Sequence, residues 1–95
     1  MKRVLTQNYA EILGFTGNAD NLSEILDFCD TRRIYIDTRH SVSETPLGQH
    51  TTYEADVYYK DTLITTTPAC NDLTGLLHLS CLYGLKYLVQ KKAQS

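Results

Sequence analysis

The feature that most constrains this fold is a change from a helical to a two-residue period in the middle of the chain. Residues 33–42, 51–59 and 62–67 each alternate between two kinds of side chain and are rich in β-branched residues. Such alternation is typical of strands that bury one face. Because the stretches follow one another closely, the sequence predicts a three-stranded antiparallel sheet.

The connections between these strands differ in length. Residues 43–50 contain Pro46 and Gly48 and are predicted to form a loop. Lys60 and Asp61 leave room only for a tight turn before the third strand. The second connection is therefore expected to be a short hairpin.

A helix is predicted on each side of the sheet. Asn21 and Glu24 have capping-box spacing, and Arg32 and Arg33 suit the negative end of a helix that ends near them. The apolar stripe of this helix consists of Leu22, Ile25, Leu26 and Cys29, with Phe28 on its border.

The last helix is predicted from residue 72, after a cap at Asn71 or Asp72, to about residue 91. Its apolar positions are Leu73, Leu76, Leu77, Leu79, Leu82, Leu85, Leu88 and Val89. It also contains Gly75, Ser80, Cys81 and Gly84, and each glycine costs about 1 kcal/mol of helix propensity relative to alanine. Small residues at such a cost predict a close approach of the helix backbone to the sheet or to another chain.

The first twenty residues are predicted to form a short helix or a half-ordered arm, followed by a linker. Residues 4–13 have helical spacing, with an apolar stripe at Val4, Leu5, Tyr9, Ile12 and Leu13, and residues 14–20 have the composition of a linker. We therefore divide the chain into an N-terminal helix or arm with its linker (1–20), one α+β domain (21–91) and a solvated tail (92–95). The predicted fold is α-β-β-β-α, with the sheet packed against helices and an extra short N-terminal helix.

Charge and cysteine usage limit the classes of function. The net charge of −2 gives no basic footprint of the kind that nucleic-acid binding usually leaves. Cys29, Cys70 and Cys81 form no Cys-x-x-Cys pair, no signal peptide precedes them, and no apolar run approaches the roughly 18–20 residues that span a bilayer. We expect a cytoplasmic protein with free thiols and no membrane segment.

The order of helix, three strands and helix over residues 21–89 resembles the double-stranded-RNA-binding domain. "ILDFCDTRR" (25–33) resembles the first-helix pattern of that family, and "GQHTTYEADVYY" (48–59) resembles its loop-to-strand segment. The hairpin "VYYKDTLI" (57–64) has the expected length. The resemblance implies both helices on one face of the sheet.

The same resemblance implies three contacts with duplex RNA. Asp27 matches the first-helix contact and His50 matches the histidine of the first loop. The third contact is a lysine cluster at the start of the last helix, and here no Lys or Arg occurs between residues 61 and 85. Without it, the electrostatic contribution to duplex affinity is lost. The RNA-binding alternative would then depend on Asp27, His50, Arg32, Arg33 and Arg39, and these cations, with Lys60, look scattered.

No residue pattern nominates a catalytic or metal site. His78 and Cys81 lie three residues apart, with Cys70 upstream, but the spacing matches no zinc pattern. A small core cysteine and a solvent-facing histidine are the favoured interpretation. Asp37, His40, Ser41 and Ser43 cannot converge as a catalytic group, because adjacent residues of a strand point to opposite faces. We expect no metal, no cofactor and no enzyme activity.

Two groups of residues favour protein binding. Glu24, Asp27 and Asp30 recur every three residues on the first main helix and can form an acidic face, although a solvated helix side has the same pattern. Tyr35 and Tyr58 are expected on the face of the sheet opposite the core, where tyrosines often anchor interfaces.

The last helix has more leucine than one sheet face needs. Leu79, Leu82 and Tyr83 spread around it, which predicts either burial by the N-terminal segment or a homodimer seam.

The leading hypothesis is a non-catalytic protein-interaction module. It would act as a small inhibitor or adaptor, of the counter-defence type found in viruses and mobile elements, on a protein partner or through self-association. The alternative is a weak double-stranded-RNA-binding protein.

Overall fold

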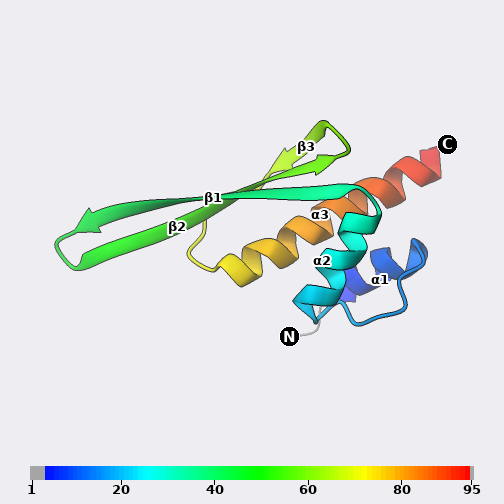
Figure 1. The fold of residues 1–95 in the computed structure, drawn as a ribbon, viewed down its shortest axis with the longest axis horizontal. Coiled ribbons are helices and arrows are strands. Elements are labelled where there is room, and N and C mark those ends of the chain that lie inside the picture. Colours follow the sequence, from blue (N-terminus) through cyan, green and yellow to red (C-terminus); the bar gives the residue numbers. More distant parts are fainter. Residues whose placement is uncertain (1–3, 95) are drawn as a thin grey trace.

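The computed structural model describes residues 4–94, which form three helices and a three-stranded sheet (Figure 1). Their order along the chain is α1 (Val4–Ile12), α2 (Leu22–Thr31), β1 (Ile34–Thr45), β2 (Gly48–Tyr59), β3 (Thr62–Thr66) and α3 (Leu73–Gln94). The α+β class and the antiparallel sheet packed against helices are confirmed.

The sheet has the order β1-β2-β3, and its first hairpin is longer than predicted. The β1–β2 register runs from Ile34 opposite Tyr59 to Thr45 opposite Gly48, so only two residues remain for the turn. The predicted loop over 43–50 is therefore confined to Pro46 and Leu47, and the prediction is wrong for 43–45 and 48–50, which are strand. The Thr45 hydroxyl donates to the Gly48 carbonyl at 2.9 Å, and Gly48 has a φ of 124°, which glycine adopts without strain.

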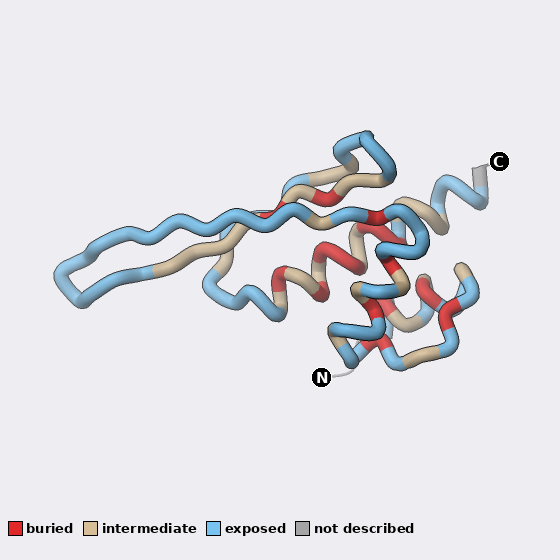
Figure 2. Tube along the Cα trace, in the orientation of Figure 1, coloured by how far each residue is buried: buried red, intermediate tan, exposed pale blue. Residues whose placement is uncertain are grey.

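The outer part of this hairpin, residues 41–52, extends away from the body of the molecule (Figures 1 and 2). Residues 41–50 of this hairpin extension are all exposed. Its base is tied to the segment before α3, where Tyr53 and Cys70 exchange two backbone hydrogen bonds. The extension is thus anchored at its base, and both of its faces contact solvent.

All three helices lie on one side of the sheet (Figure 1). The core between them contains Ile25 and Cys29 of α2, Ile34 and Val57 of the sheet, and Leu85 of α3, all at most 3% exposed. Each fully buried aliphatic side chain contributes roughly 1.5–3 kcal/mol.

The predicted close approach of α3 to the sheet occurs at Gly84. A Cβ atom at this position would lie 2.5 Å from Cγ2 of Ile34. Ser80 and Cys81 are also fully buried, and so is His78, which was expected to face solvent. Small side chains thus let the helix backbone lie against β1.

The N-terminal segment packs onto α3 with a face that differs from the predicted one. Val4, Leu5 and Ile12 are 54–60% exposed, whereas Thr6 and Ala10 are buried. The predicted stripe is wrong at these three positions, because small side chains allow a closer contact between helices.

The segment 14–20 also belongs to the core. Phe15 and Ala19 are buried in it, and Phe15 packs 5.0 Å from Phe28, centroid to centroid. The Gln7 side chain accepts from the Ala19 amide at 2.7 Å and donates to the Gly17 carbonyl at 3.1 Å. Although its composition is that of a linker, this segment is held against α1.

Candidate functional site

The face of the sheet that points away from the helices carries an apolar row. We call it the outer face, and it consists of the side chains that alternate with Ile34, Ile36, Ala55 and Val57. Tyr35 lies directly opposite Tyr58, and Tyr58 lies directly opposite Leu63. Tyr35 is 44% exposed and Leu63 is 53% exposed, so three strands present one apolar row to solvent.

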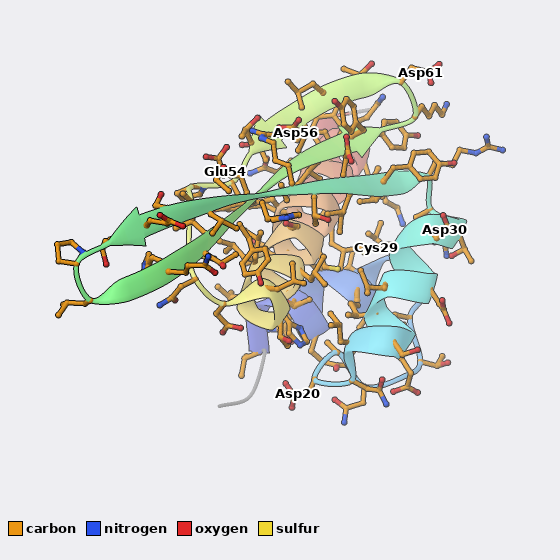
Figure 3. All side chains as sticks on the ribbon, turned by 60° about the vertical axis from the view of Figure 1, so that its left-hand side comes forward. Asp20, Cys29, Asp30, Glu54, Asp56 and Asp61 are labelled. Atoms are coloured by element: carbon orange, nitrogen blue, oxygen red, sulfur yellow. The ribbon has the colours of Figure 1, made fainter. Side chains whose placement is uncertain are left out.

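Charged side chains lie beside this row. The Arg39 guanidinium donates to Glu54 at 2.7 Å and to Asp56 at 2.8 Å, and the Thr66 hydroxyl donates to Asp56 at 2.8 Å. The Thr66 hydroxyl, followed by Arg39, holds the pKa of Asp56 below its usual value. Glu54 and Asp56 project from β2 on the side away from α2 (Figure 3).

The predicted acidic residues of α2 are exposed, and one of them lines a cavity. Glu24, Asp27 and Asp30 all face solvent. Asp30 and Tyr35 line a cavity of about 340 Å³ between α2 and β1, together with apolar side chains that include Leu26 and Leu77. The structure therefore brings two of the predicted protein-binding residues together at the edge of the sheet.

Leu79, Leu82 and Tyr83 are half-buried on α3. The sequence predicts that either the N-terminal segment or a second copy of the chain covers this helix. The first of these is present, because α1 packs against α3. A homodimer seam on the same helix stays a prediction.

The candidate RNA-binding residues do not converge. Asp27 lies on α2 and His50 lies in the hairpin extension. Arg39 is held by Glu54 and Asp56, which raise its pKa, Glu54 most.

Arg32 and Arg33, which look scattered in the sequence, lie near other cations in the structure. Together with Lys60, Lys91 and Lys92 they line one cavity of about 490 Å³, which we call the cationic pocket. The sequence signal for this grouping is that each of these residues lies at the end of a helix or in a turn. Only the arrangement of those ends in space makes them neighbours.

The remaining thiols and imidazoles form no metal cluster within residues 4–94, where no three His, Cys, Asp or Glu side chains are grouped for an ion. Cys29 on α2, which is labelled in Figure 3, and Cys81 on α3 are both buried, and their thiols are close enough to interact. The Cys81 thiol and burial together raise the pKa of Cys29. Such a thiol stays protonated at neutral pH.

Comparison with known proteins found no matching family model, no matching curated protein and no matching solved structure. The resemblance to the double-stranded-RNA-binding domain therefore stays a prediction. None of the helices in residues 4–94 combines the length and the apolar character that a membrane crossing requires.

Proposed function

We propose that this chain is a non-catalytic protein-interaction module that binds a protein partner through the outer face of its sheet. The observation that carries the proposal is the Tyr35–Tyr58–Leu63 row. It lies across three strands, on the face that none of the helices in residues 4–94 covers. Tyrosines supply large apolar area at a small loss of side-chain entropy and are enriched among residues that dominate binding energy.

The size of the surface suits a protein more than a small molecule. A standard interface buries about 800 Å² on each partner, and the outer face continues into the hairpin extension along the longest dimension of the molecule, 51 Å. On that extension Leu47, in the turn, is 100% exposed, and Val42, on the face opposite to the tyrosine row, is 53% exposed. A partner could contact the row and the extension together.

The charge of this surface selects the partner. Asp37, Glu54 and Asp56 are set against Arg39 alone on the outer face, so the face favours a partner with a basic rim. Such binding can block a partner without any chemistry, which is why we place the chain among small inhibitors or adaptors.

The test is a double variant, Tyr35→Ser/Tyr58→Ser, compared with Leu5→Ser. Leu5 is an exposed apolar residue of α1, 60% exposed, remote from the outer face. Partners captured from the native host extract, treated with nuclease and then purified, should bind the double variant at least about tenfold more weakly and the Leu5 variant unchanged. Equal affinity for both variants would refute the outer-face proposal.

The same variants address self-association. If the partner is another protein, sedimentation of the purified chain should show a monomer. If the partner is a second copy, it should show a dimer that the double tyrosine variant disrupts. A dimer that survives in the tyrosine variant and dissociates on Leu79→Ser/Leu82→Ser would instead locate the seam on α3.

The RNA-binding alternative is tested separately with a duplex gel shift at several salt concentrations. The proposal expects no shift even at low salt. A shift that weakens steeply as salt rises would support phosphate contacts and the alternative.

A further inference from the structure

The cationic pocket lies at the end of the molecule opposite the hairpin extension. Three chain segments meet there: the junction from α2 to β1, the turn between β2 and β3, and the last turns of α3 (Figure 1). Its cations are Arg32, Arg33, Lys60, Lys91 and Lys92, and its other lining residues are Leu13, Thr31, Tyr59 and Leu88. No acidic residue within residues 4–94 lines it, and it collects five of the nine Lys and Arg residues of a chain with net charge −2.

Stabilisation of helix ends does not account for this gathering. Two helix C-termini supply about one negative charge in total, which is far less than five positive charges. Arg32 has a structural partner, since its guanidinium donates to the Leu13 carbonyl at 2.6 Å and lies 5.1 Å from the Phe28 ring centroid.

Three of the other four cations that line the pocket have no carboxylate partner among the described residues. Within residues 4–94, Arg33, Lys60 and Lys91 form no ion pair, although Asp61 follows Lys60 in the turn. Lys60 and Lys91 instead place their Nζ atoms 5.3 and 4.7 Å from the centroid of the Tyr59 ring. An aromatic face offsets only part of an ammonium charge.

Backbone strain coincides with the pocket. Among residues 4–94, the only non-glycine residues with positive φ are Arg33, at 64°, and Lys60, at 55°. The Lys60 amide donates to the Arg33 carbonyl at 2.9 Å, so the two strained residues hold each other. Arg33 follows the C-cap of α2, a position where helices commonly end with a left-handed residue and most often with glycine. Glycine would fit both positions with less strain, yet both carry cations that line the pocket.

The chemistry of the pocket matches a phosphorylated small molecule. Guanidinium groups bind phosphate oxygens in pairs, ammonium groups act as point charges, and several cations suit more than one phosphate. A cavity of about 490 Å³ is in the range of small-ligand sites, and Leu13 and Leu88 offer contact to an apolar part.

The distribution of the remaining cations argues against a nucleic-acid backbone. Arg39 is ion-paired on the outer face, and Lys86 is exposed on α3 but does not line the pocket. No basic track therefore leads from the pocket across the described surface. We propose that the cationic pocket binds a small ligand that carries two or more phosphate groups.

The test is calorimetric titration of the full chain with tripolyphosphate, pyrophosphate and orthophosphate at about 50 mM salt, where electrostatic contacts are weakly screened. Tripolyphosphate should bind at least about tenfold more tightly than orthophosphate, because several cations act on one ligand. Lys91→Gln and Lys60→Asn should each weaken it by about tenfold, and Lys86→Gln should leave it unchanged. Asparagine is chosen at position 60 because it tolerates positive φ.

Arg33→Gly separates binding from folding. It should raise the melting temperature, because glycine relieves the strained φ, and should weaken tripolyphosphate binding by about tenfold. A more stable variant that binds less cannot be explained by misfolding.

Absence of tripolyphosphate binding would overturn the proposal. An equal loss of binding in Lys86→Gln would also overturn it, because the ligand would then be attracted by the overall charge and not by the pocket. Tighter binding of duplex RNA at matched phosphate concentration, lost in the same pocket variants, would replace the small ligand with a nucleic acid. Unchanged tripolyphosphate binding in Tyr35→Ser/Tyr58→Ser would show that this site and the outer face act independently.

Discussion

Gly84 and Gly75 lie on the same helix and illustrate how one residue type can have two different roles. A Cβ at position 84 would meet Cγ2 of the buried Ile34 at 2.5 Å, whereas a Cβ at position 75 would meet the exposed Asp72 carboxylate at 2.7 Å. The first contact is with packed core, and the second is with a side chain that can turn away. The two glycines are therefore expected to respond in opposite directions to the same substitution.

We predict that Gly84→Ala destabilises the protein by about 1–2 kcal/mol, since overpacking outweighs the gain in helix propensity. Gly75→Ala should stabilise it by roughly 0.5–1 kcal/mol. Urea denaturation of both variants measures the difference. A stable Gly84→Ala protein would mean that α3 does not lie against Ile34.

The three thiols should differ in reactivity for a related reason. Cys29 and Cys81 are buried, and Cys70 is half-exposed. Iodoacetamide at pH 8 should modify only Cys70 in the folded protein and all three cysteines in denaturant, because a buried protonated thiol is a poor nucleophile. Peptide mass spectrometry locates the adducts, and rapid native modification of Cys29 would contradict its place in the core.

The raised pKa of Cys29 also predicts a pH dependence of stability. The folded state holds this proton more tightly than the unfolded chain, whose thiol has the ordinary value of 9.0. The contribution of this thiol to the free energy of unfolding is therefore fully present below pH 9. Above pH 9 the unfolded chain loses the proton and the folded protein keeps it, so the free energy of unfolding decreases by about 1.4 kcal/mol per pH unit. The free energy of unfolding should fall less between pH 9 and 10 in Cys29→Ala than in the parent protein.

At the scale of elements, the hairpin extension contrasts with the rest of the sheet. Its two strands pair in register but bury almost nothing, since residues 41–50 are all exposed. Backbone hydrogen bonds there gain little over bonds to water, and ordering the strands costs entropy. The extension should thus contribute little to the stability of the body.

We predict that the extension can be removed without unfolding the domain. Ser41 pairs with Thr52, so residues 42–51 can be replaced by Asn-Gly, which suits a two-residue hairpin. The free energy of unfolding should change by less than about 1 kcal/mol. Loss of cooperative unfolding, followed by circular dichroism in urea, would show that the extension supports the fold.

At the scale of the whole molecule, the N-terminal segment is part of the single core. Phe15 is only 9% exposed although its neighbours in sequence are polar. Arg32 of α2 reaches back to the Leu13 carbonyl, so α2 and the end of α1 are joined directly. The sequence assigns residues 1–20 to a helix or arm with a linker, and the described part of that segment packs into the core.

Phe15→Ala should therefore destabilise the protein by about 2–4 kcal/mol, as expected for truncation of a buried aromatic side chain. Leu47→Ala, at the fully exposed hairpin tip, is the matched control and should change stability by less than about 0.5 kcal/mol. Urea denaturation compares the two. A small effect at Phe15 would favour an N-terminal segment that is independent of the core.

The secondary structure of a segment could be predicted from the sequence where that segment buries one face and exposes the other. Alternation identified the inner halves of β1 and β2, where Ile34, Ala55 and Val57 meet the helices. It could not identify residues 43–45 and 48–50 as strand, because both faces of that ribbon contact water and leave no apolar period. On α1, period alone could not reveal that Thr6 and Ala10, and not the larger apolar residues, face α3.

The two candidate sites differ in the same respect. Tyr35 and Tyr58 were predicted on one face because alternation along each strand assigns the faces, and register then made them direct neighbours. The cationic pocket draws on residues near positions 32, 60 and 91, which no local pattern connects.

The sequence by itself determined the kind and order of the elements, because periodicity and capping act over a few residues. Only the tertiary structure decided which ends of those elements meet. The contacts that bring the cations together, such as the Lys60 amide with the Arg33 carbonyl, depend on packing between segments distant in the chain. That packing is set by how closely small residues such as Gly84 let the helices approach the sheet.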